Sequence, residues 1–214
     1  MNAEQRADLY RLLGALVLVP PAEELLAALS SAHAFDTFAE CGPEGTLREA
    51  LESMGTDLAR GPEALNEIRR DHIRLFVGPK KKLAPPWESV YRSADRIVMQ
   101  EQSVEVLRAY ATQRIGFKGM GETPADHAGY ELEFVAILIG RSRRSKQARE
   151  ALSSFLNDHL LAWVPAWAAD VRKHAKSAFW RGFGEALTAL CAVEEQALEA
   201  SGTKPRRRLP LHAN

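Results

Sequence analysis

Hydrophobic residues recur at helical spacing along almost the whole chain, and no stretch shows the strict alternation of a half-buried strand. In residues 3–18, leucines and a valine return every three or four positions and form one apolar stripe, which is typical of an amphipathic helix. The same spacing predicts further helices at residues 23–29, 46–58, 63–77, 98–115, 128–140, 152–163, 166–174 and 179–198. The pattern therefore predicts an all-α fold, a single globular domain of about nine or ten helices over residues 1–203.

Glycines and prolines mark where several of these helices end. Gly78-Pro79 is expected to stop the helix at 63–77, because glycine tolerates a left-handed exit and proline cannot continue the hydrogen-bond ladder. Pro165 is expected to break or kink the chain between two later helices. In the helix at 98–115, the apolar side is predicted to consist of Val104, Leu107, Tyr110 and Ala111.

The stretch at 128–140 is apolar nearly all round, which predicts a helix buried in the middle of the domain. Thr123, Pro124 and Asp126 precede it with the order expected of a helix start. Threonine can cap, proline suits the first helical position, and an acid at the third position can bond back to the cap. The sequence therefore predicts that this helix begins at Thr123.

Composition narrows the class of protein. The 214 residues are 46% hydrophobic and 26% charged, an ordinary globular balance. Lysine plus arginine and aspartate plus glutamate both number 28, so the net charge is zero and gives no electrostatic reason to expect nucleic acid as a partner. The only two cysteines, Cys41 and Cys191, lie far apart, which fits a reducing compartment.

An apolar run near the N-terminus, Leu12–Val19, was tested against targeting and membrane-spanning patterns. It lacks the preceding cationic region of a signal peptide, and it is far shorter than the roughly 20 residues that a membrane span needs. We therefore expect a cytoplasmic protein without stable membrane insertion. At the other end, residues 204–214 form a basic tail that is expected to be mobile.

One stretch, LFVGPKKKLAPPWESVY at residues 75–91, departs from the helical pattern. Its two adjacent prolines hold the chain extended, and Trp87 and Tyr91 follow directly. A large aromatic side chain on such a segment is costly to leave in water. Trp87 is therefore expected either to pack into the core or to bind a partner.

Asp126, His127 and Glu131 are the strongest candidates for chemistry, because the latter two lie four residues apart on one helix face. They allow an acid–base pair, two metal ligands, a polar patch for a cationic partner, or simply a capped helix start. Further metal ligands at suitable spacing are lacking, and Gly116, Gly119 and Gly121 do not form a phosphate loop. The residues alone favour a binding protein over an enzyme, with no catalytic residue, metal or cofactor.

Several sequence blocks resemble the TorD/DmsD family of cytoplasmic molybdoenzyme maturation chaperones. These blocks are GP followed by LAPPWESVY, then ETPADHAGYELEF, then HLLAWVPAWAADV and a final helix with Phe179-Trp180. They occur in the family's order over nearly the whole chain, and PPWESVY and E-x-P-x-D-H are the specific ones. Lysines between Gly-Pro and Leu-Ala-Pro-Pro depart from the family's mostly apolar residues there.

The resemblance implies an all-helical chaperone that binds the precursor of a molybdopterin-dependent oxidoreductase, often through its twin-arginine leader peptide. Such a chaperone delays export until the cofactor is inserted. The motif positions that would bind the leader or client are Pro85, Pro86, Trp87, Glu88, Ser89, Tyr91, Glu122, Pro124, Asp126 and His127. Carboxylates of Glu88, Glu122 and Asp126 would pair with the leader's guanidinium groups, and aromatic side chains would receive its apolar segment.

Two other classes of protein stay open at this point: a helical metal-dependent hydrolase using Asp126 and His127, and a regulatory adaptor that binds a folded partner through the basic tail. The oligomeric state is also open between a monomer and a domain-swapped dimer. The glycine-rich residues 116–121 would be the hinge for such an exchange.

Overall fold

A computed structural model describes residues 1–42, 45–78 and 82–202. The basic tail at 204–214 and two of the three lysines of the central stretch, Lys80 and Lys81, lie outside the described residues. Within the described ranges the structure contains helices and no extended strand, so the all-α prediction is confirmed.

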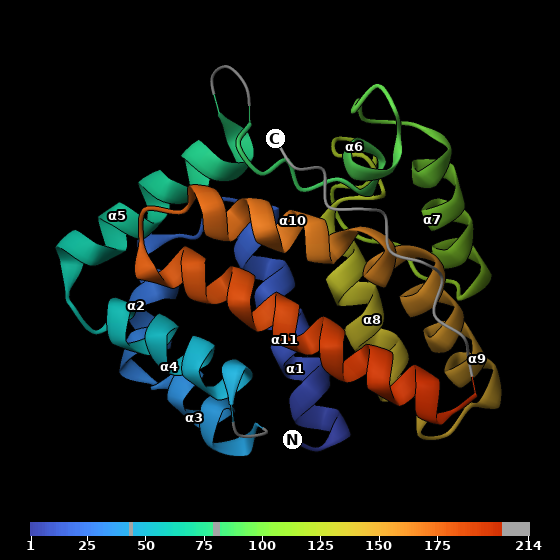
Figure 1. Cartoon of the computed structure of the whole chain (residues 1–214), viewed down its shortest axis with the longest axis horizontal. Helices are drawn as coiled ribbons and strands as arrows, with labels where there is room; N and C mark the ends of the chain where they lie inside the picture. The colour runs from blue at the N-terminus through green and yellow to red at the C-terminus, as the bar shows by residue number, and fades with distance from the viewer. Residues whose placement is uncertain (43–44, 79–81, 203–214) are drawn as a thin grey trace.

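The described residues form ten continuous helices, since α5 continues into η1 and α9 continues through η2 into α10. Figure 1 shows their arrangement. In chain order the elements of the described residues are α1 (Ala3–Leu18), α2 (Glu23–Ser31), α3 (Ala34–Cys41), α4 (Thr46–Leu58), α5 (Pro62–His72) with η1 (Ile73–Val77), α6 (Glu88–Arg92), α7 (Glu101–Thr112), α8 (Ala128–Ser142), α9 (Lys146–Phe155) with η2 (Leu156–Leu160) and α10 (Leu161–His174), and α11 (Ala178–Ala200).

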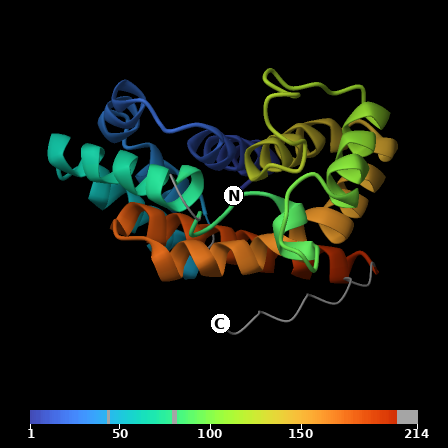
Figure 2. The same ribbon diagram turned by 90° about the horizontal axis from the view of Figure 1, so that it is seen from above.

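Two helix pairs form the body of the domain. Figure 2 shows α10 and α11 side by side on one face and α1 with α8 on the other, with α5 at one end and α7 at the opposite end. Helix α4 also packs on α11. The core between these layers is aromatic, and Trp163, Trp167 and Trp180 are all fully buried.

The crossing of α1 and α8 depends on glycine. A Cβ atom at Gly14 would lie 2.9 Å from the carbonyl oxygen of Gly129, and one at Gly129 would lie 2.9 Å from Cβ of Leu18. Only residues without a side chain allow the two backbones to approach this closely. The close contact fixes the first turn of α8, which carries Glu131 and is preceded by Asp126 and His127.

Most predicted helix positions are confirmed, but the start of α8 was wrong. The helix begins at Ala128, and His127 is its N-cap, so Thr123 is not a cap and Asp126 is not a capping-box acid. Residues 124–127 form a turn closed by the bond from His127 N–H to the Pro124 carbonyl. The reason is tertiary: the backbone at 126–128 is bonded to a distant segment, as described below.

Of the break or kink predicted at Pro165, the break does not occur. Pro165 lies inside α10, and the helical path continues from Lys146 to His174 through the π-helical turn η2. Buried side chains on both sides of the proline, Val164 and Trp167, hold this stretch in the core. Two short helices, α3 and α6, were not predicted, and residues 88–92 were expected to be free of helix.

The apolar side predicted for α7 was only partly correct. Tyr110 is fully buried, but Val104 and Leu107 are 48% and 46% exposed, and Ala111 is exposed. The residue that enters the core instead is Val106. Helix α7 begins at Glu101 and ends at Thr112, so it is also shorter than the predicted range of 98–115.

Candidate functional site

The two sequence blocks that carry the family resemblance lie against each other. Glu88 N–H donates to the Asp126 carbonyl over 3.0 Å, and Ala128 N–H donates to the Pro86 carbonyl over 2.9 Å. The two bonds form an isolated antiparallel bridge between Trp87 and His127. Segments 40 residues apart in sequence are thereby joined at the point where α6 and α8 both begin.

Asp126 caps α6 from across this bridge. Its Oδ2 accepts the Ser89 backbone N–H at 2.8 Å, and its Oδ1 accepts the hydroxyl of Ser103, on α7, at 2.5 Å. The side chain is fully buried. One carboxylate therefore ties the start of α6 and the first turn of α7 to the segment that precedes α8. We call this place the Asp126 junction.

His127 is a buried, neutral cap of α8. Its Nδ1 accepts the Gly129 backbone N–H at 3.0 Å, and its ring lies edge-on to Trp87 with the centroids 5.3 Å apart. Burial, and to a smaller degree the charge of His72, lower the pKa of His127 to about 3. A histidine that is neutral and already accepts a backbone hydrogen bond at Nδ1 serves the helix start, not proton transfer.

Glu88, the first residue of α6, belongs to a buried polar cluster beside the Asp126 junction. Its carboxylate accepts from the guanidinium of Arg92, one helical turn later, and from Nδ1 of His159 at 3.0 Å. Arg92 also donates to the Asp158 carbonyl, 2.9 Å away, which links α6 to η2. Glu88 is fully buried and occupied by these partners.

Glu131 lies in the same buried region, but the group that donates a hydrogen bond to it, the indole of Trp163, is neutral. Its Oε2 accepts the indole N–H of Trp163 at 3.0 Å, and its Oε1 has no partner among the described residues. Burial, and then the charge of Glu88, raise the pKa of Glu131 well above its ordinary value. Glu131 therefore favours the neutral acid, whereas Glu88 pairs with the guanidinium of Arg92.

Two aromatic side chains flank the junction. Trp87 is half-buried, with Nζ of Lys82 lying 5.2 Å from its ring centroid. Tyr91 is buried, donates its hydroxyl to Asp170 at 3.0 Å and packs against Trp163. Of these two motif residues, Trp87 is the one that is partly accessible to solvent.

The remaining predicted residues divide into buried and accessible ones. Pro86 and Ser89 are buried in the bridge, whereas Pro85 and Pro124 are half-buried beside it. Glu122 is exposed on the loop before α8. The structure thus brings Pro86, Trp87, Glu88, Ser89, Asp126 and His127 together, and Glu122 is the only one of the three predicted carboxylates that lies at the surface.

Sequence reasoning missed three members of the cluster: Arg92, Ser103 and His159. Arg92 follows Glu88 at the i, i+4 spacing of a helical ion pair, and this signal was available had a helix been expected there. Ser103 and His159 come from α7 and η2, and nothing in the local sequence marks them as partners of Asp126 and Glu88.

Unpaired polar atoms gather around the Asp126 junction. Eight buried side-chain nitrogen or oxygen atoms of the described residues lack a hydrogen-bond partner, and five of them belong to Trp87, Ser89, Ser93, Gln102 and Glu131. Such atoms are uncommon in native proteins because each one loses its bonds to water on folding. The junction therefore has hydrogen-bonding capacity that the fold does not use.

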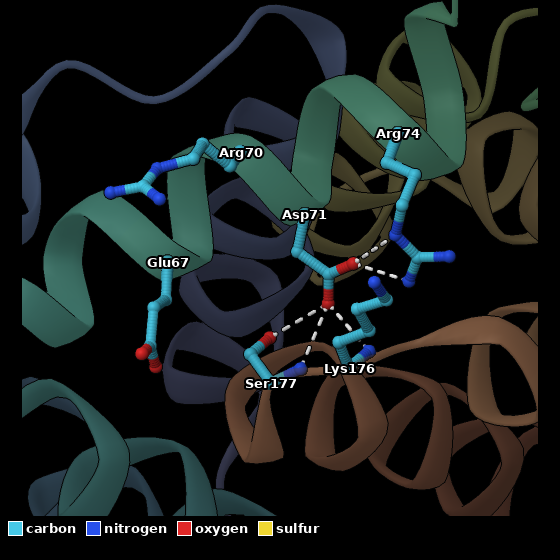
Figure 3. A pocket seen from close by; sticks show the side chains of 6 residues that line it. All are labelled: Glu67, Arg70, Asp71, Arg74, Lys176 and Ser177. Atoms are coloured by element: carbon cyan, nitrogen blue, oxygen red, sulfur yellow. Dashed lines mark hydrogen bonds and ion pairs between the residues drawn. The ribbon is translucent and has the colours of Figure 1, made fainter.

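A second polar region centres on Asp71, whose two carboxylate oxygens both accept hydrogen bonds. Asp71, on α5, accepts the N–H groups of Lys176 and Ser177, the Ser177 hydroxyl and the guanidinium of Arg74 (Figure 3). It lies in a surface pocket of about 400 Å³ that Glu67 and Arg70 also line. Because every oxygen of Asp71 is engaged at the start of α11, we interpret this region, the Asp71 junction, as structural.

Neither region resembles a metal centre. Among the residues that the structure describes, no three histidine, cysteine, aspartate or glutamate side chains are grouped so that they could hold a metal ion. Within the same residues, no helix has the length and apolarity to cross a membrane.

Comparison with known proteins connects this geometry to a family. Residues 43–169, more than half of the chain, match the model of the family described as nitrate reductase delta subunit. Three similar proteins all carry the name chaperone protein TorD. The one from Vibrio parahaemolyticus is 24% identical and the one from Vibrio atlanticus 26%, each over 91% of this chain and 95% of its own length. The one from Photobacterium profundum is 25% identical over 89% and 93%.

The names of these relatives denote chaperones and not catalysts, in agreement with the expectation that the chain is not an enzyme. The match covers both blocks of the Asp126 junction, since residues 85–91 and 122–127 lie inside the matched range. The chain belongs to the nitrate reductase delta subunit family, the family of the TorD chaperones.

Proposed function

We propose that this protein is a cytoplasmic, system-specific chaperone for the catalytic subunit of a molybdopterin-dependent oxidoreductase. It binds the precursor, through its twin-arginine leader peptide or the apo-enzyme body, and delays export until the cofactor is in place. The observation that carries this proposal is the pairing of the two family blocks at the Asp126 junction, with unused hydrogen-bonding atoms beside an accessible tryptophan.

The ten motif residues then act in two ways. Trp87, Pro85, Pro124 and Glu122 are accessible, so they contact the client directly. The buried residues Pro86, Glu88, Ser89, Tyr91, Asp126 and His127 act through position, since their side chains or backbones are bonded to α6, α7, α8, η2 and α10.

The test is a calorimetric titration with leader peptides from molybdoenzymes of the same organism. Trp87→Ala and Asp126→Ala are each expected to weaken leader binding more than about tenfold, because anchors of this kind commonly contribute about 2 kcal/mol. Phe38→Ala is the matched control, since Phe38 is a half-buried aromatic residue on α3, distant from the junction in Figure 1. Circular dichroism would check that all three variants fold. Unchanged affinity in both junction variants would remove the proposed site.

Two alternatives have their own tests. A metal-dependent hydrolase using Asp126 and His127 would show bound metal and activity on a phosphatase panel. An adaptor acting through the tail would lose its partner when residues 204–214 are deleted, whereas the chaperone proposal expects that deletion to be nearly silent.

The oligomeric state remains an expectation. The connection between α7 and α8 contains Gly119 and Gly121 at positive φ of 84° and 109°, so it can change direction without steric strain. A domain-swapped dimer through residues 116–121 would appear in sedimentation as a second species beside the monomer.

A further inference from the structure

The outward face of α7 and the segment before it expose an unusual number of apolar side chains. Ile97, Val98 and Met99 are 50%, 39% and 73% exposed, and Val104 and Leu107 follow at 48% and 46%. These five, which we call the α7 apolar surface, are nearly half of the eleven large hydrophobic side chains that are exposed among the described residues. Such a concentration within eleven consecutive residues is typical of an interaction surface.

Carboxylates border this surface. Glu101 and Glu105 are four residues apart, so they lie on one face of α7, next to the stripe of Val104 and Leu107. Glu101 is exposed, Glu105 is half-buried, and neither forms an ion pair with another described residue. Arg108 lies between the carboxylates and the apolar stripe on the same helix and is the one nearby cation of α7.

The Asp126 junction holds α7 in place. Ser103 donates to Asp126, and the Tyr110 hydroxyl donates to the Ala125 carbonyl at 3.1 Å. Val106 and Tyr110 face the core with no exposed surface, so the opposite side of the helix must face outward. In Figure 2, α7 lies at the edge of the molecule, away from the α5 end. The buried motif residues thus position a surface that they do not themselves form.

We propose that the α7 apolar surface binds the apolar segment of the client's leader peptide, with Glu101 and Glu105 binding the arginines that precede that segment. This proposal rests on the proposed chaperone function and names where the leader lies. A peptide with two guanidinium groups followed by an apolar helix-forming stretch matches two free carboxylates beside an apolar stripe.

A second copy of this chain fits the surface less well. In a two-fold interface the same surface of both copies meets, so the four carboxylates of Glu101 and Glu105 would share only the two Arg108 cations of α7. Like charges close to each other oppose association, whereas the arginines of a leader neutralise them. The charge pattern therefore favours a cationic peptide.

The apolar contact is tested with the double variant Val104→Gln/Leu107→Gln. Because both side chains are already about half exposed, the fold is expected to tolerate glutamine, and leader affinity is expected to fall about tenfold. The matched control is Leu25→Gln/Val193→Gln, which changes two exposed apolar residues on α2 and α11 and is expected to leave the affinity unchanged.

The charge contact is tested with Glu101→Gln/Glu105→Gln. We expect affinity to fall by roughly threefold to tenfold and to become less sensitive to salt, as for exposed ion pairs. Glu49→Gln/Glu52→Gln removes two exposed carboxylates of α4 and serves as the control. Arg108→Gln is expected to strengthen binding slightly, because it removes a cation near the leader's arginines.

A double-mutant cycle distinguishes contact from general electrostatics. If Glu101 and Glu105 contact the arginines, replacing the arginines by glutamine costs less in the Glu101→Gln/Glu105→Gln variant than in the wild-type protein. Additive losses would show that these carboxylates do not contact the leader.

The outcomes separate this inference from the proposed function. If the wild-type protein binds a leader and Val104→Gln/Leu107→Gln binds it equally well, the α7 location is wrong and the chaperone function stands. If the wild-type protein binds no leader, this inference falls, and the chaperone function is then tested by binding to the apo-enzyme body. If the double variant converts a dimer to a monomer in sedimentation without a change in leader affinity, the surface is an interface between copies and the inference is overturned.

Discussion

Two buried aspartates, Asp71 and Asp126, each fix the start of a helix in a different part of the fold. Each accepts backbone N–H groups at the start of a helix that is distant in sequence, α11 for Asp71 and α6 for Asp126. Around Asp71, the atoms of Arg74, Lys176 and Ser177 that face it are bonded (Figure 3). Around Asp126, by contrast, five buried side-chain atoms have no partner.

This difference in pairing indicates that the Asp71 junction is structural, whereas the Asp126 junction is a candidate binding region. Directly after Asp71 in sequence, Nδ1 of His72 is unpaired, but its ring packs against Phe76 and Trp180 in the core. At the Asp126 junction the unpaired atoms lie beside the accessible Trp87 and below the exposed face of α7. A capped helix start alone therefore does not indicate function, whereas unused polar atoms next to an exposed apolar surface do.

The largest effect that tests this comparison is on stability. Asp71→Ala leaves the start of α11 and Arg74 without their partner, and we expect a loss of about 3 kcal/mol in the free energy of unfolding. Leader affinity of the folded variant should be unchanged. Asp126→Ala should cost about 1–2 kcal/mol and also weaken leader binding.

Urea unfolding and titration of the two variants, performed side by side, provide the check. The comparison would fail if Asp71→Ala lowered leader affinity as strongly as Asp126→Ala, since both aspartates would then affect the same binding region.

The second effect is a loss of stability in mild acid. Burial lowers the pKa of His127 to about 3 and that of His72 to about 4, both below the value near 6.5 of the unfolded chain. As the pH falls from 7 to 5, the unfolded chain takes up protons that the folded protein does not, so stability decreases by about 1 kcal/mol or more per histidine.

His127→Asn keeps an acceptor for the start of α8 but cannot titrate, so its stability should fall less between pH 7 and 5. His33→Asn, which changes an exposed histidine at positive φ that asparagine tolerates, is the control for replacing a histidine outside the core. Glu131, whose raised pKa gives the opposite slope, is present in all three proteins, so their differences isolate His127. Parallel curves for His127→Asn and the wild type would show that His127 is not held neutral.

The smallest effect is expected at Glu131, which is compared with Glu88, the other buried glutamate of this region. Because Glu131 favours the neutral acid, Glu131→Gln should change stability at pH 7 by less than about 0.5 kcal/mol, while Glu88→Gln should cost about 2 kcal/mol by removing the buried carboxylate that Arg92 and His159 contact. Denaturant unfolding measures both. Equal losses in the two variants would show that Glu131 carries a charge in the fold.

Helix positions followed from the sequence because apolar spacing reflects burial directly. The orientation of α7 could not be predicted from the sequence. Helical spacing allows either Val104 and Leu107 or Val106 to lie on the same side as Tyr110, and only the packed fold determines which of them faces the core. The order of residues 123–126 likewise satisfied a local capping rule, but Asp126 instead caps α6, with Ser89 37 residues away in sequence.

The resemblance to a family pointed to two segments that the fold joins, but it gave no reason for their pairing. Pro86, Glu88 and Asp126 were expected to face a client, yet all three are buried, and Glu88 and Asp126 bind side chains of η2, α6 and α7. Such contacts join elements that are far apart in sequence, and a motif pattern contains no information about which other element completes it.

Hydrogen exchange with and without a bound leader peptide tests the central claim most directly, because one experiment reports on both junctions. We predict slower exchange at α6 and α7, residues 88–112, and no change at the Asp71 junction, residues 67–74 and 176–177. Slower exchange confined to the Asp71 junction, with α6 and α7 unchanged, would contradict the assignment of the Asp126 junction and the α7 apolar surface to client binding.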